Sequence, residues 1–317
     1  MIEAKYGYSA SLDTKCIFQA VFSSLNDNSM LNYISGFKAW KNFAKDNDLK
    51  VFPVSNSEFS IFLIEALKNG ASWATLNKYI CAAKYFHKIL GLDKVIEISD
   101  SLELYLKKFC RQPNAQKRPI EVTEVYSLMN LAKSERPSLK LYRDLSLVIF
   151  GYFGFCRFDD YAQIKFSDLS IEGNVFTTVI RAAKNDKHFK GQQLSFELDS
   201  QCSSIFKGYL RMSKPKRGNS DSYLFLNLTK GSKISEKLSY KEARDSILNI
   251  CVLAGLDVGR LGTHSFRIGA ASVATRKNVN EKHIEKHGRW APGSSAKNRY
   301  QRVSKEDHII ISRALRK

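Results

Sequence analysis

The chain has 317 residues, which is enough for two domains of ordinary size, each with its own hydrophobic core. Hydrophobic residues make up 44% of it and aromatic residues 12%, a composition that excludes an intrinsically disordered chain. Fifty Lys and Arg against 31 Asp and Glu leave a net charge of +19, which favours a polyanionic partner. Nucleic acid is the first expectation, and an anionic membrane surface or an acidic protein are the alternatives.

The N-terminal sequence lacks the charged and then apolar layout of a secretory signal peptide. The longest nearly unbroken apolar stretch, residues 145–155, has about half the length that a bilayer span needs. We therefore expect a soluble, intracellular protein without membrane contact, in the nucleus of a eukaryotic host or otherwise in the cytoplasm. The six cysteines lie far apart without C-x-x-C spacing, so we expect buried small side chains and neither a disulfide framework nor a metal site. They are Cys16, Cys81, Cys110, Cys156, Cys202 and Cys251.

In the first third of the chain, apolar side chains recur every three or four residues, which predicts amphipathic helices. The apolar stripes cover residues 33–44, 59–67, 76–90 and 102–109. Gly70 and Gly91 follow two of them and are expected to end those helices. The pattern predicts a helical N-terminal domain of four or five helices over residues 1–112.

Residues 113–119 are expected to be an exposed linker, because the surrounding segment has two prolines, three cations and no large apolar side chain. The second domain is expected over residues 120–317. Its predicted helices cover residues 122–132, 139–155, 201–211, 240–253, 265–276 and 280–286, with two more toward the end. Short strands are predicted at residues 166–171, 175–181 and 193–198. The expected fold class is mainly α-helical with a small antiparallel sheet (α+β).

The sharpest local motif is His264-Ser-Phe-Arg267 at the start of a predicted helix. A spacing of three places both side chains on one helical face. The residues that follow are small and apolar, so the helix should be buried and its polar first turn should need a partner. Taken alone, the motif is weak and favours the simpler interpretation, a capping histidine and a surface arginine.

Other chemically suitable residues stand in order around this motif. Trp290 lies downstream in His287-Gly-Arg-Trp290, and Tyr300 follows ten residues later in Asn-Arg-Tyr-Gln-Arg302. Upstream, Arg157 follows the apolar helix over residues 139–155, and Lys184 lies in the turn between the second and third predicted strands.

This ordered set resembles the tyrosine recombinase family, which includes phage-type integrases and Cre-like recombinases. The Gly-Arg-Trp and Arg-Tyr-Gln-Arg segments look most similar to recombinases of eukaryotic mobile elements. Arg157 and Asp160 match the family's Arg-x-x-acid box, with Asp in place of the more usual Glu. The gap from Trp290 to Tyr300 is one or two residues longer than is usual in the family. The resemblance implies a core-binding domain over residues 1–112 and a catalytic domain over residues 120–317.

The chemistry of these residues agrees with that resemblance. Attack on a phosphodiester builds negative charge on its oxygens, and the forked, always charged guanidinium groups of Arg157 and Arg267 suit that charge. His264 would donate to the same phosphate or accept the proton of Tyr300 as a general base. Attack by Tyr300 gives a covalent ester that conserves the energy of the broken bond, so ATP, a metal or another cofactor is not expected.

The departing 5′ oxygen needs a proton, and Lys184 on its hairpin is the candidate donor, with Lys187 and Lys190 in the same loop as alternatives. Trp290 would offer its indole N–H to a phosphate oxygen and a large surface to the pocket, unless it is plain core packing. His287 is a rival for that place.

The resemblance also implies assembly on DNA. Two domains would form a clamp around double-stranded DNA at specific recombination sites, and four protomers would exchange strands. Residues 261–317 hold 13 Lys and Arg against four Asp and Glu, so the end of the chain is strongly basic. The apolar segment over residues 309–315 would dock on a neighbouring protomer as a C-terminal tail or pack on its own domain.

The function expected from sequence is site-specific DNA recombination through a 3′-phosphotyrosine intermediate, for integration or excision of a mobile element. A type IB topoisomerase is the nearest enzymatic alternative, although that family usually has Lys at the position of His264. A domesticated, non-catalytic DNA-binding protein is the alternative of another class. A metal-dependent integrase of the DDE type is disfavoured, since no compelling carboxylate triad is present in the sequence.

Overall fold

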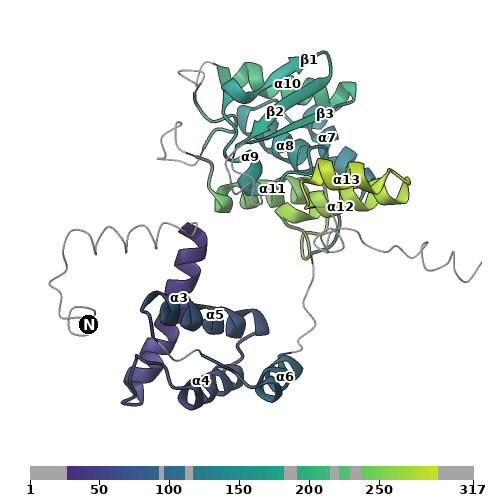
Figure 1. Ribbon diagram of the computed structural model, residues 1–317. Coiled ribbons are helices and arrows are strands. Elements are labelled where there is room, and N and C mark those ends of the chain that lie inside the picture. The colour runs from purple at the N-terminus through teal and green to yellow at the C-terminus, as the bar shows by residue number, and fades with distance from the viewer. Residues whose placement is uncertain are drawn as a thin grey trace, which may run out of the picture. The chain divides into compact units, whose positions relative to one another are not determined.

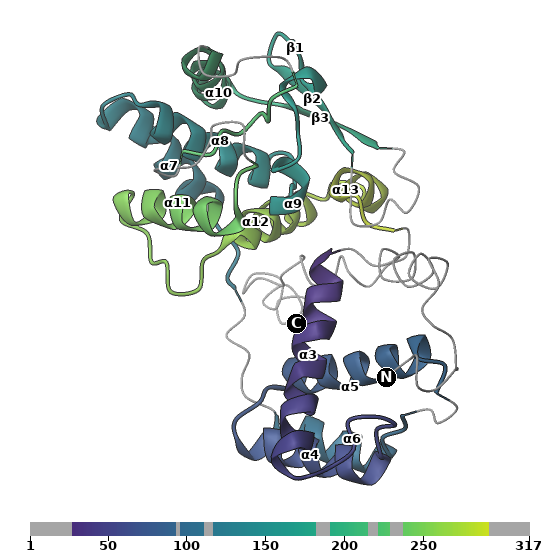
Figure 2. The same ribbon diagram turned by 90° about the vertical axis from the view of Figure 1, so that its left-hand side faces the viewer.

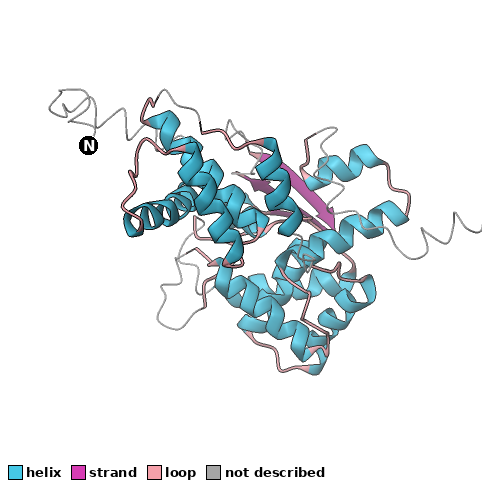
Figure 3. Cartoon of the chain, turned by 90° about the horizontal axis from the view of Figure 1, so that it is seen from below, coloured by secondary structure: helices cyan, strands magenta, loops and turns pink. Residues whose placement is uncertain are grey.

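The chain divides into two compact units, residues 1–114 and 115–317, and each is described by itself (Figure 1). The computed structural model describes residues 27–92, 96–110, 117–181, 191–214, 221–228 and 237–291. Within these ranges no helix combines the length and the apolar character that crossing a membrane would require. Strands occur only in the second unit among the described residues, and helices make up the rest of the regular structure (Figure 3).

The first unit consists, over its described part, of four helices. They are α3 (Asp27–Asp46), α4 (Asn56–Lys68), α5 (Trp73–Ile89) and α6 (Asp100–Phe109). Their core is aromatic: Trp40 and Phe59 are fully buried and meet edge to face at 5.4 Å between ring centroids. The helical stripes expected from the sequence are therefore confirmed.

Local features of the first unit explain where its helices end and how closely they pack. Gly70 and Gly91, which follow α4 and α5, have φ angles of 85° and 58°, a region that glycine enters without strain. Gly36 on α3 lies against α5, where an added Cβ would come within 3.1 Å of the Lys78 carbonyl oxygen. The two helices can therefore cross in close contact, as Figure 2 shows.

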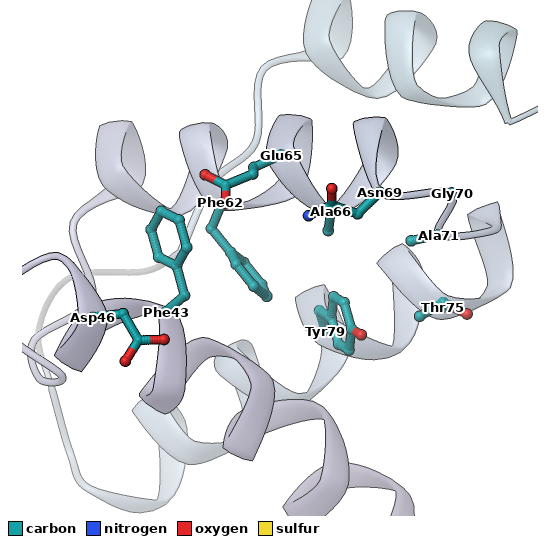
Figure 4. Close-up of a pocket in the computed structure, with 10 residues that line it drawn as sticks. All are labelled: Phe43, Asp46, Phe62, Glu65, Ala66, Asn69, Gly70, Ala71, Thr75 and Tyr79. Carbon is teal, nitrogen blue, oxygen red and sulfur yellow. The ribbon is translucent and has the colours of Figure 1, made fainter.

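A pocket of about 450 Å³ opens between α3, α4 and α5 (Figure 4). The rings of Phe43, Phe62 and Tyr79 line it, and the carboxylates of Asp46 and Glu65 stand at its edge. The pocket lies within the first unit and contains none of the candidate catalytic residues.

The second unit is built around α8 (Leu139–Tyr152), in which 11 of 14 residues are buried. Helices from both sides of it in the sequence pack against it. They are α7 (Val122–Ser134), α10 (Ser200–Ser213), α11 (Tyr240–Leu253) and α12 (Thr263–Arg276). Two short helices complete the described part, α9 (Phe158–Tyr161) and α13 (Glu281–Gly288). A buried central helix explains why residues 145–155 form a nearly continuous apolar run.

The antiparallel sheet has three strands in the order β1 (Ser170–Glu172), β2 (Val175–Ile180) and β3 (Gln192–Glu197). Phe176 on β2 pairs with Phe196 on β3, and both rings are buried. Phe196 meets Phe150 of α8 edge to face at 5.2 Å, which attaches the sheet to the central helix. The expected fold class, mainly helical with a small antiparallel sheet, is confirmed.

Several detailed expectations were wrong. Residues 166–168 form a 3₁₀ turn, η1 (Phe166–Asp168), because the Asp168 carboxylate accepts from the Lys165 backbone N–H at 3.0 Å and closes a turn before β1. The helix expected over residues 139–155 ends at Tyr152. The aromatic side chain of Phe109, expected on a buried stripe, is 58% exposed.

The cysteines are only partly as expected. Cys156, Cys202 and Cys251 are buried, whereas Cys81 and Cys110 are half-buried. All five are free thiols. Cys16 lies outside the described residues.

Candidate active site

Arg157 does not end the apolar helix but opens the next one. It occupies the N-cap of α9 in extended backbone, and its N–H donates to the Asp160 carboxylate at 2.8 Å. Asp160 is 2% exposed, so this capping carboxylate is held inside the protein. The Arg157 side chain itself is half-buried and keeps contact with the surface.

His264 and Arg267 lie in the first turn of α12 and have different environments. His264 is exposed, whereas Arg267 is fully buried. Desolvation by the surrounding protein lowers the pKa of His264, and so do the positive charges of Arg267 and Arg157. This desolvation is the larger cause, and the two arginine charges add to it. The charges of Arg157 and Arg267 therefore both act on the His264 ring.

Arg267 is fully buried and is bound by the protein itself. Its two terminal nitrogens donate to the backbone carbonyl oxygens of Phe155 and Gly288. Its guanidinium carbon lies 4.6 Å from the centroid of the Trp290 ring, a cation–π arrangement. A phosphate can therefore reach this guanidinium only after a local movement uncovers it.

Trp290 owes its position to the glycine two residues earlier. The indole is 5% exposed and packs near Phe155 at 6.3 Å between centroids. A Cβ at Gly288 would collide with the six-membered ring of Trp290, so the ring folds back over the end of α13 only because position 288 is glycine. Core packing and contact with Arg267 are thus both properties of this tryptophan.

Arg289 is a part of the site that the sequence analysis missed. It is 7% exposed, and its Nη2 donates to the Asp160 carboxylate at 3.0 Å. The same carboxylate lies 3.9 Å from Nη1 of Arg267, which is too long for a hydrogen bond but close for an ion pair. The only signal in the sequence was an arginine between a helix-ending glycine and a tryptophan.

Over residues 119–307, the chain matches the family model described as "Phage integrase family", which covers more than half of its length. The chain belongs to the phage integrase family. Its members are tyrosine recombinases, so the resemblance inferred from the sequence is confirmed. No significant match was found among curated proteins.

Solved structures share the fold of this family member at low sequence identity. The XerH recombinase bound to its difH substrate before cleavage is 18% identical, with a TM-score of 0.62, over 89% of this chain and 78% of that one. The Tn1549 transposon integrase bound to transposon right-end DNA is 12% identical, with a TM-score of 0.59, over 93% and 98%. A lambda integrase tetramer on a Holliday junction is 14% identical, with a TM-score of 0.57, over 95% and 84%.

Within this phage integrase fold, two described residues close to Arg157 are unsuited as nucleophiles. Burial raises the pKa of the Cys156 thiol, next to Arg157, to about 12, so it is protonated near neutral pH. Burial also raises the pKa of Tyr161, which is 2% exposed. His287, the rival of Trp290, has a ring nitrogen 2.7 Å from the Phe153 carbonyl oxygen and is occupied there.

The structure thus gathers Arg157, Asp160, His264, Arg267 and Trp290 from three separate segments of the chain. Tyr300 and the three lysines of the hairpin loop lie outside the described residues, as does the tail over residues 309–315.

Proposed function

We propose that this protein is a site-specific DNA recombinase that cleaves and rejoins strands through a 3′-phosphotyrosine at Tyr300. The observation that carries the proposal is the gathering of two arginines and a histidine beside one tryptophan: Arg157, His264, Arg267 and Trp290. Membership of the phage integrase family and a fold shared with recombinases solved on DNA support it.

Charge balance in the cluster suits an anion. The single carboxylate of Asp160 faces two buried guanidinium groups, at 3.0 Å from Arg289 and 3.9 Å from Arg267. Buried charge is costly unless it is compensated, so a phosphate placed beside these groups would be stabilised. Arg157 and Arg267 would share the two non-bridging oxygens once Arg267 is uncovered.

The proposed reaction moves two protons and one phosphoryl group. The Tyr300 phenol oxygen bonds to phosphorus while the bond from phosphorus to the 5′ oxygen breaks. His264 accepts the phenol proton, a role that its lowered pKa favours because the ring is neutral near neutral pH. Lys184 protonates the departing 5′ oxygen, with Lys187 or Lys190 as alternative donors. The 5′ hydroxyl of another strand then attacks the phosphotyrosine and regenerates Tyr300.

We place this chemistry in a tetramer on two DNA sites, and the structure of a lambda integrase tetramer bound to a Holliday junction supports the tetramer. The two units would grip duplex DNA at specific recombination sites, and the tail over residues 309–315 would dock on a neighbouring protomer. Integration or excision of a mobile element is the proposed biological outcome. The energy of the broken bond is held in the tyrosine ester, so neither ATP nor a metal or other cofactor is required.

The test is incubation with a nicked suicide substrate that carries the flanking ends of the protein's own genetic element. Wild type is expected to form an SDS-stable adduct at the 3′ phosphate, and Tyr300→Phe is expected to form none while binding the same DNA. Absence of the wild-type adduct would mean a non-catalytic DNA-binding protein. Relaxation of any supercoiled plasmid without sequence preference would instead favour a topoisomerase.

A further inference from the structure

Arg289 combines a disfavoured backbone conformation with a side chain that donates four hydrogen bonds. It follows α13 with a φ angle of 53°, in the left-handed region where helices usually end on glycine. A residue with a Cβ is disfavoured there, so the presence of arginine at this position points to a specific contribution from its side chain.

The guanidinium of Arg289 joins three segments of the second unit. Nη1 donates to the carbonyl oxygens of Gly154 at 3.3 Å and His287 at 3.0 Å. Nη2 donates to the Phe155 carbonyl oxygen at 3.0 Å and to the Asp160 carboxylate at 3.0 Å. The loop after α8, the helix α9 and the end of α13 are therefore held by one side chain that is 4% exposed.

Arg157 and Arg267, which would bind the phosphate, both depend on groups that Arg289 contacts. The Asp160 carboxylate that binds Arg289 also accepts from the Arg157 backbone N–H at 2.8 Å. The Phe155 carbonyl that accepts from Arg289 accepts from Arg267 as well. Phe155, like Arg289, is a non-glycine residue with a left-handed backbone, and its φ angle is 47°. A hydrogen bond therefore joins the two strained residues directly.

We propose that Arg289 is a positioning residue, which holds the Asp160 carboxylate away from Arg267 so that Arg267 can bind the DNA phosphate. The inference rests on the proposed recombinase function. Asp160 lies 3.0 Å from Arg289 but 3.9 Å from Arg267, so its hydrogen bond goes to Arg289. Without that partner the carboxylate would pair with Arg267 and compete with the phosphate for the same guanidinium.

The test compares Arg289→Gly with wild type in single-turnover formation of the SDS-stable adduct at saturating DNA. Glycine suits the left-handed backbone, so this variant removes the side chain without adding backbone strain. We expect the cleavage rate to fall by about 10- to 100-fold, the size of effect that misplaced reacting groups give, while the Kd for DNA changes less than about 2-fold. Asn278→Gly is the matched control, since Asn278 is exposed and has a φ angle of 54°, and it should cleave at the wild-type rate.

A second substitution separates positioning from simple structural damage. Asn in place of Asp160 can still accept from the Arg157 N–H but has no charge to offer Arg267. The double variant Arg289→Gly with Asp160→Asn should therefore cleave faster than Arg289→Gly alone, a rescue that loss of packing does not predict. A double variant that is equally slow or slower would overturn the proposed mechanism.

Arg289→Lys keeps the inference testable if Arg289→Gly fails to fold. Lysine retains the buried charge but lacks the planar fork that reaches the carboxylate and the carbonyls together, so its cleavage rate should fall by about 10-fold. A wild-type rate in any folded Arg289 variant would overturn the inference alone. Absence of adduct in wild type run alongside would overturn the proposed function, and this inference with it.

Discussion

Two buried clusters of charge lie in the second unit, and they differ in their balance. In the first, the fully buried Arg143 on α8 faces two carboxylates, those of Asp144 and Glu242. In the second, the single carboxylate of Asp160 faces two buried arginines, Arg267 and Arg289.

The partners of Arg143 show what a structural cluster requires. Its nitrogens donate to Asp144 at 2.9 Å, to the Leu226 carbonyl oxygen at 3.0 Å and to the Ser246 hydroxyl at 2.8 Å. These contacts tie α8 to α11 and to the segment that carries Leu226. Lys140 adds a second cation at 2.7 Å from Asp144, so the two positive and two negative charges balance there and no outside ion is needed. A cluster in which arginines outnumber carboxylates is instead suited to receive an anion.

Breaking the structural cluster should give the largest effect. Arg143→Ala leaves Glu242 without its arginine and Asp144 with only the exposed Lys140, so we expect a loss of about 3–5 kcal/mol in the free energy of unfolding. Chemical denaturation measures it. Arg244→Ala, which removes an exposed partner of Asp245 on α11, is the control and should change stability by less than about 0.5 kcal/mol. A similar loss in both variants would show that Arg143 has no special structural role.

Substitutions in the cluster of Asp160, Arg267 and Arg289 should change the cleavage rate more than the stability. Arg267→Ala removes a donor to the charge that develops on the phosphate, so adduct formation should slow by about 100- to 1000-fold. Asp160 keeps Arg289, while two carbonyl oxygens lose a donor and Trp290 loses its cation–π contact, so the stability loss should be about 1–3 kcal/mol, below that of Arg143→Ala.

Arg276→Ala is the matched control for Arg267→Ala, since it removes an arginine from the exposed end of the same helix, where it pairs with Glu121 at 3.1 Å. It should cleave at the wild-type rate. If Arg267→Ala also cleaved at that rate, the contrast between the two clusters would be lost.

The smallest expected effect concerns pH. Because the pKa of His264 is lowered in the folded protein, the ring stays neutral until the pH falls below its ordinary value of 6.5. The cleavage rate should then fall about 10-fold per pH unit below the lowered pKa, since the protonated ring cannot accept a proton. Folding should also lose stability as the pH falls from 6.5 to that pKa, because the unfolded chain takes up the proton first.

Single-turnover rates across this pH range test the assignment. His264→Gln should be slow and should lack this pH dependence, whereas His283→Gln, at an exposed position of α13, should keep the wild-type profile. An unchanged pH profile in His264→Gln would remove the general-base role from His264.

The sequence predicted the parts of the fold that depend on local periodicity. The residues of α11 were predicted with the bounds that the structure has, Tyr240–Leu253, because one apolar face repeats through the helix. The four-residue helix α9 is too short for such a pattern, and η1 owes its turn to the Asp168 carboxylate instead of to apolar spacing.

The site was predictable in its residue types but not in its contacts. The order of Arg157, His264, Arg267 and Trp290 can be read from the chain, because each suits one part of the chemistry. The burial of Arg267 depends on a carbonyl 112 residues away, and the role of Arg289 on a carboxylate 129 residues away. Such distant contacts leave no periodic trace in a single sequence.

The segment that enters the second unit is fastened directly to the helix that carries His264 and Arg267. The Ile120 N–H donates to the Ser265 carbonyl oxygen at 3.1 Å, and the Arg118 N–H donates to the Arg260 carbonyl oxygen at 2.8 Å. Gly269 on α12 leaves no room for a Cβ beside the Ile120 carbonyl, so the two backbones touch. A mechanical pull on the chain at residue 118 is therefore transmitted to α12 through main-chain bonds, with no flexible side chain to absorb it.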